Sequence, residues 1–156
     1  MAATTPNTIV LSDQPYVQGE AKANGTAHTP GELVETLSTD VTKIQRHSTA
    51  GGNAQPMFVL ENPYSDPADG PRIDAAYGTI DTVRYIAARS GDQIYGWLTV
   101  GASVNIGVFL ESAGSLGALR ATTAGTVNLS RTRFKALQAV NNSAGGARAR
   151  IKVEVI

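Results

Sequence analysis

The chain has 156 residues with thirteen basic and thirteen acidic side chains, so its formal net charge is zero. This length suits one domain with a real core, and the balanced charge argues against a partner recognised by bulk charge, such as naked DNA or an anionic membrane surface. The absence of cysteine excludes a disulfide scaffold, a thiol nucleophile and a thiolate metal site. Sixteen glycines and only 17% charged residues are typical of short strands joined by tight turns. We therefore predict an all-β protein that binds neither nucleic acid nor a membrane.

Residues 1–30 are polar and contain few side chains able to bury apolar area. No basic segment followed by an apolar run begins the chain, so no secretory signal is predicted. The segment is either a frayed terminus or an arm that becomes ordered on a neighbouring subunit, and we predict the second. The predicted contact residues of this arm are Thr8, Ile9, Val10, Leu11, Tyr16 and Val17.

Short strand candidates begin at residue 31. Residues 32–37, 42–46 and 56–60 are separated by polar or glycine-containing turns, and residues 61–72 form a proline-rich surface loop. Asp66, Asp69 and Asp74 in and beside this loop faintly resemble a calcium loop. The alternating aspartate order and the closing glutamate of such a loop are missing, so we predict no metal site.

Residues 82–87 and 94–100 predict a hairpin around a turn at 89–92. Val83, Tyr85 and Ala87 share one face of its first strand. Tyr95 and Trp97 share a face of the second strand, where we favour core packing over a base-stacking platform because basic residues near Trp97 are not evident. The run 104–110 is the most apolar stretch and is predicted to be the centre of the core.

The clearest pattern lies at the end of the chain. Period-two alternation puts Ile151, Val153 and Val155 on one face of a strand and the charged residues between them on the other. Residues 31–37 and 130–140 also allow a helical spacing. Roughly eight to ten strands at intervals of about ten residues predict one small β-barrel or β-sandwich. We assign residues 31–156 to this β domain and residues 1–30 to an extended N-terminal arm.

The sequence contains no recognisable catalytic arrangement. His28 and His47 lack a metal-binding spacing and are expected to be solvated surface histidines. The serine within residues 114–117 has the wrong spacing for a nucleophile elbow, and no glycine-rich phosphate loop occurs. We predict no catalytic residue, no cofactor and no metal, and hence no enzyme.

Three longer stretches, residues 7–11, 47–62 and 136–156, with 91–95 and 104–112 between them, resemble the head decoration or capsid cement proteins of tailed bacteriophages. Residues 12–30 match no part of that pattern. The resemblance implies a structural virion protein, made in the host cytoplasm, that binds the outside of the head and stabilises the mature lattice. It implies the major capsid protein and neighbouring copies, as a dimer or trimer, as partners. It implies no catalytic residue.

Two other functions stay open. A phage-borne glycan- or receptor-binding module would use exposed aromatic residues on loops, for which Tyr64 and Tyr77 are the candidates. A small β-barrel enzyme or regulatory subunit would need titratable groups clustered in a pocket.

Overall fold

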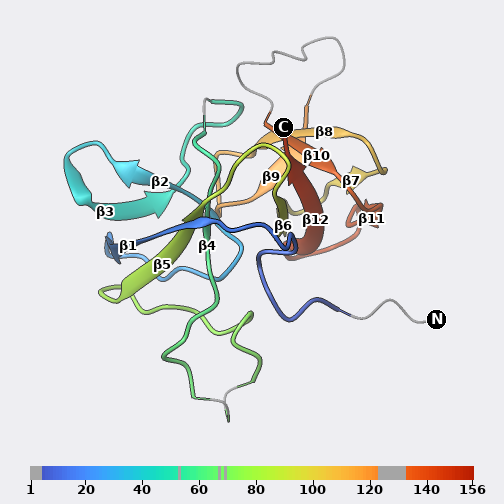
Figure 1. The fold of residues 1–156 in the computed structure, drawn as a ribbon. Coiled ribbons are helices and arrows are strands. Elements are labelled where there is room, and N and C mark those ends of the chain that lie inside the picture. The colour runs from blue at the N-terminus through green and yellow to red at the C-terminus, as the bar shows by residue number, and fades with distance from the viewer. Residues whose placement is uncertain (1–4, 53, 67, 69, 123–132) are drawn as a thin grey trace.

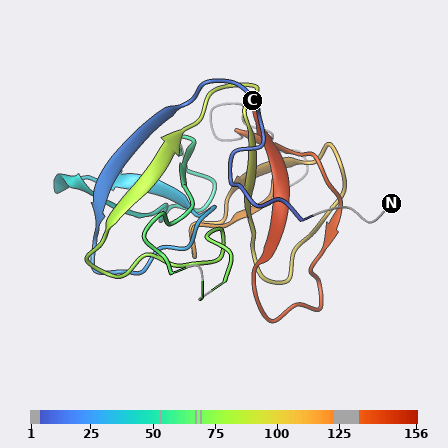
Figure 2. The ribbon, with the colours of Figure 1, turned by 60° about the horizontal axis from the view of Figure 1, so that its bottom comes forward.

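The computed structural model describes residues 5–52, 54–66, 68, 70–122 and 133–156, which form two closed five-stranded sheets (Figure 1). The prediction of an all-β fold is confirmed, since no α-helix occurs in these residues. The prediction of one barrel or sandwich is corrected to two barrels in one chain. In Figure 2 the blue-to-green part of the chain forms one barrel, and the yellow-to-red part forms the other.

The first barrel comes from the N-terminal half of the chain. Around the barrel, the strands are β1 (Val17–Ala23), β3 (Asp40–Arg46), β2 (Leu33–Leu37), β4 (Met57–Val59) and β5 (Thr82–Ala87). The helical spacing noted for residues 31–37 is not realised, because β2 pairs its backbone with β3 on one side and β4 on the other.

The second barrel comes from the C-terminal half. Its strands, in order, are β10 (Phe134–Ala136), β12 (Ala149–Val155), β6 (Gln93–Leu98), β9 (Leu119–Ala121) and β8 (Phe109–Ser112). A two-stranded ribbon of β7 (Ser103–Val104) and β11 (Val140–Asn141) accompanies it. The helical alternative for 130–140 is excluded for the described residues 134–136 and 140, which are extended, whereas residues 130–132 lie outside the described part.

The predicted hairpin of 82–87 and 94–100 is wrong. Both strands exist, but β5 pairs with β1 and β4 in the first barrel, and β6 pairs with β12 and β9 in the second. The turn at 89–92 is real, with the Asp92 carboxylate accepting a 2.8 Å hydrogen bond from the amide of Arg89. It carries the chain from one barrel to the other. The two strands do not pair with each other, because strands from elsewhere in the sequence are hydrogen-bonded to their edges.

Strand β4 belongs to the first barrel and lies between two hydrophobic cores. Met57 and Val59 belong to the core of the first barrel, whereas Phe58 belongs to the larger core that fills the second. The Phe58 ring meets Phe134 of β10 edge to face, with ring centroids 5.4 Å apart. All three β4 residues are buried for this reason, as expected for a strand covered on both faces.

The alternation predicted for the last strand is confirmed. Ile151, Val153 and Val155 are buried and the charged residues between them are half-buried. The prediction for 104–110 holds only in part, because Val104 and Leu110 are buried but Ile106 is largely exposed. Residues 105–108 lie in a turn between β7 and β8, and the side chains of a turn cannot all point into the core.

The segment predicted as an arm packs with the rest of the chain. Ile9 is 0% exposed in the core of the second barrel, Val10 forms a β-bridge with Ile94, and the amide of Leu11 donates to the carbonyl of Gln93. Residues 17–23 form β1. Composition alone did not predict that this segment is ordered. Its backbone hydrogen bonds fix it to β6 and β5, and these bonds need no apolar side chain.

Candidate functional site

A buried carboxylate joins the two barrels. Glu32, just before β2, accepts hydrogen bonds from Arg46 of β3 at 3.0 Å, from Arg148 at 2.7 Å and from His28 at 3.2 Å. Burial alone would raise the pKa of Glu32, but the hydrogen bonds from these three partners lower it below its ordinary value. Since Arg148 directly precedes β12, this ionised group fixes the second barrel to the first.

Two guanidinium groups lie over the indole of Trp97. The distance from the guanidinium carbon to the ring centroid is 4.7 Å for Arg148 and 3.8 Å for Arg150. The Trp97 Nε1–H donates to the carbonyl of Pro30 at 2.9 Å, and Arg150 donates to the same carbonyl at 2.8 Å. The prediction of no basic residues near Trp97 is therefore wrong. These cation–π contacts occupy the ring and tie β6 and β12 to the connection before β2.

Ser112, His47 and Glu35 form a chain of polar contacts that resembles a serine hydrolase relay. The Ser112 Oγ lies 2.7 Å from His47 Nδ1, and His47 Nε2 lies 3.6 Å from the Glu35 carboxylate. Ser112 is only 1% exposed, and its Oγ already accepts a bond from the amide of Gly114. A nucleophile that no substrate can reach performs no acyl transfer, so we assign the three residues to linking β8 with β2 and β3.

Both histidines were predicted at the surface, and both are buried. His28 contacts Glu32, four residues away, and His47 contacts Ser112 of β8, 65 residues away, so each buried ring has a polar partner. Of the two tyrosines considered for glycan contact, Tyr77 is fully buried and Tyr64 is 74% exposed. Only Tyr64 can contact a ligand from its present position.

The calcium-like loop is not supported by the described residues. Asp74 pairs with Arg150 at 3.2 Å, and Asp66 bonds to the amide of Ala68, while Asp69 lies outside the described residues. Within the described part of the chain, no group of three or more acidic or histidine side chains gathers that could hold a metal ion.

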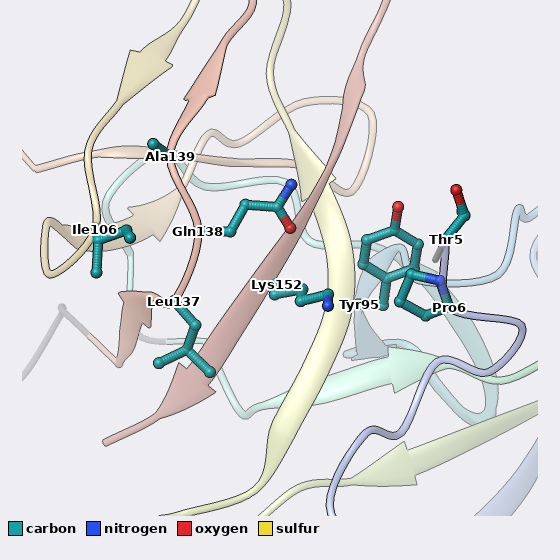
Figure 3. A pocket seen from close by; sticks show the side chains of 8 residues that line it. All are labelled: Thr5, Pro6, Tyr95, Ile106, Leu137, Gln138, Ala139 and Lys152. Carbon is teal, nitrogen blue, oxygen red and sulfur yellow. The ribbon is translucent and has the colours of Figure 1, made fainter. Parts of the chain in front are cut away.

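A groove of about 420 Å³ lies on the outer face of the second barrel (Figure 3). Lys152 and Tyr95, cross-strand partners on β12 and β6, form its floor. Thr5 and Pro6 line one side, and Ile106 with residues 137–139 lines the other. The lining contains no carboxylate and no histidine, so the groove is suited to contact with another molecule and lacks the groups of a hydrolytic site.

The fold as a whole is shared with a phage head protein. The N base of head fiber gp8.5 in bacteriophage phi29 has a crystal structure that superposes on this chain with a TM-score of 0.57, over 91% of this chain and 95% of that one. The two sequences are 11% identical. The likeness is one of fold. No family of known proteins and no curated protein matches the sequence.

The six predicted contact residues do not form one surface. The Ile9 side chain is in the core, and Val10 and Leu11 are half-buried against β6. Thr8 is exposed, and Tyr16 and Val17 are exposed at the start of β1 in the first barrel. The sequence did not indicate the junction around Glu32, because its members come from three separate segments, residues 28–32, Arg46 and Arg148. No helix in the described residues is long and apolar enough to cross a membrane.

Proposed function

We propose that this chain is a structural protein of a phage virion that sits on the outside of the head. The observation that supports this is the fold shared with the N base of a phage head fiber, which extends over nearly the whole of both chains. The same location was predicted from the sequence, although no known family matches that sequence.

The polar chemistry of the chain agrees with a structural role. Three of the buried ionisable side chains in the described residues, Glu32, His28 and His47, contact one another or side chains of the facing barrel. Such groups fix geometry, whereas a catalytic group must meet a substrate. A small rigid body that binds only the assembled shell stabilises that shell by mass action, and small gains repeated over many sites add up.

Two finer forms of this function make different predictions. A cement subunit binds across the boundaries between capsid subunits and raises the stability of the head. A fibre base holds an appendage and need not change head stability. We propose the cement role, with the major capsid protein and neighbouring copies in a dimer or trimer as partners.

The experiment starts from virions of the phage whose genome carries this coding sequence. Mass spectrometry of purified particles should detect the chain, and immunogold labelling should place it on the outer head surface. Heads grown without it should then lose their DNA at a lower temperature if it is a cement protein. If the temperature of DNA release is unchanged, the cement role is wrong and a fibre base is the remaining interpretation. If the chain is absent from the particles, the virion role is wrong.

A further inference from the structure

Strand β1 uses only one of its two edges along most of its length. It pairs antiparallel with β5 from Val17 to Lys22, but with β3 only at Lys22 and Ala23. The hairpin of β2 and β3 extends away from the molecule, at the left of Figure 1. Among the described residues, the edge of β1 that precedes Lys22 therefore has no partner strand.

The hydrogen-bond directions identify which groups this edge presents. Antiparallel residues alternate between those that bond to the partner strand and those whose N–H and C=O point the other way. The amide of Ala23 donates to the residue preceding β5, whereas the amide of Asn24 donates to Ile44 of β3. Even-numbered residues of β1 thus face the β3 side. Gln18 and Glu20 direct their main-chain groups to that side at positions where β3 does not pair.

The opposing edge of β3 is protected by its own side chains. The Asp40 carboxylate accepts from the Thr42 amide at 3.1 Å and from the Thr42 hydroxyl at 2.6 Å, and it pairs with Lys43 at 3.2 Å. Charged and self-bonded residues of this kind keep a strand edge from pairing. The free capacity for strand pairing therefore belongs to β1.

An apolar surface adjoins the free edge. Val17 is 49% exposed, and the half-buried Tyr85 packs against the core of the first barrel. The ring of Tyr85 lies over Gly19, its cross-strand partner, so closely that a Cβ there would collide with it. A strand seated on β1 would add main-chain hydrogen bonds and cover this surface.

We propose that the β1 edge at residues 17–20 binds an extended segment of the capsid shell protein, which adds a strand to the first barrel. This rests on the proposed function, which supplies the shell as partner. Recognition would come from main-chain hydrogen bonds to Gln18 and Glu20, the mode in which a peptide extends an exposed sheet edge. Side chains of the bound strand that point inward would cover Val17 and Tyr85.

A single extended segment fits this edge better than a second folded copy does. Strand β3 remains bonded to β1 at Lys22, so it stands beside the free edge. A strand that already belongs to a sheet would have to bring its neighbouring strands past β3. A lone segment has no such neighbours.

A pair of variants at Glu20 tests the edge. Its side chain is 60% exposed, and its N–H points away from β5, so Glu20→Pro removes an outward donor without removing a barrel hydrogen bond. Glu20→Ala is the matched control, because it loses the side chain and keeps the N–H. Binding is measured by co-sedimentation with purified heads that lack this protein, and each variant is melted in parallel. We expect Glu20→Pro to bind at least tenfold more weakly and Glu20→Ala to bind like the wild type.

Hydrogen exchange on the wild-type protein gives a second measurement that needs no substitution. The amides of Gln18 and Glu20 should exchange more slowly when heads are bound. The proposal is overturned if Glu20→Pro binds heads as tightly as the wild type, or if head binding protects other amides and leaves those of Gln18 and Glu20 unchanged. In either case the protein would still bind heads, at another surface. Failure of the wild type to bind heads would instead overturn the proposed function. If Glu20→Pro does not fold, Gln18→Pro removes the neighbouring outward donor, and the exchange result decides.

Discussion

Arg148 donates a 2.7 Å hydrogen bond to Glu32 across 116 positions of sequence. Arg148 belongs to the segment entering β12 of the second barrel, and Glu32 to the segment entering β2 of the first. The bond is buried on the glutamate side, and Arg46 completes the coordination from β3. The contact therefore couples the two barrels through charge, in addition to the apolar contact at β4.

Replacing Arg148 by Ala should lower the free energy of unfolding by about 2–4 kcal/mol, since removing one partner of a buried pair leaves the other charge uncompensated. Arg46 remains to neutralise part of it. Lys43→Ala is the matched control, because Lys43 pairs with Asp40 at 3.2 Å and both side chains are about a third or more exposed, so its loss should cost less than about 1 kcal/mol. Urea titrations of the three proteins measure both. Equal costs would show that the junction contributes no more than a surface ion pair.

The same junction should make stability fall in acid. The pKa of Glu32 is lower in the folded protein than its ordinary value of 4.5. Its contribution is therefore complete above pH 4.5 and is lost as the pH falls through the folded-state pKa. Glu35 and Asp40 also have lowered pKa values, so the test is the difference between wild type and Glu32→Gln. That difference in unfolding free energy should shrink from pH 6 to pH 3. A difference independent of pH would show that ionisation of Glu32 does not stabilise the fold.

The ring contact between Phe58 and Phe134 should couple the two barrels energetically. A double-mutant cycle with Leu at each position should give a coupling energy of about 0.5–1.5 kcal/mol, beyond the loss of buried area. Each single variant should still melt in one transition, because the core that contains Phe58 also includes Leu33 of β2 and Ile86 of β5, and so joins strands of both barrels. Two separated transitions in calorimetry would mean that the barrels unfold independently.

Local patterns in the sequence predicted those features that depend on neighbours along the chain. The alternation of Ile151, Val153 and Val155 identified the last strand and its buried face. The pairing partners were not predictable in the same way, because β5 and β6 follow one another in sequence and join different barrels. A turn signal at 89–92 fixes the local backbone and says nothing about which edges are already paired.

The candidate site was less accessible to prediction than the fold. Glu32, Arg46 and Arg148 are each ordinary surface residues by type, and only the closure of two barrels brings them together. The burial of His47 was missed for the same reason, since its partner Ser112 is 65 residues away. His28, in contrast, is buried against Glu32, which is itself held by Arg46 and Arg148. The free edge of β1 is likewise a property of pairing, which no single stretch of sequence encodes.

The N-terminal segment provides the last prediction, and it reverses the expectation of a dispensable arm. Ile9 is fully buried among core residues of the second barrel, and its carbonyl accepts from the Tyr95 amide at 2.7 Å. Ile9→Ala should therefore destabilise the fold by about 2–5 kcal/mol, as for other buried aliphatic side chains. Val41→Ala, at an exposed position on β3, is the control and should change stability by less than about 0.5 kcal/mol. Deleting residues 1–30 should abolish cooperative folding, because it also removes β1 and opens the first barrel. Thermal melts of the three proteins decide the matter: a truncated protein that melts like the wild type would restore the arm and place the core wholly within residues 31–156.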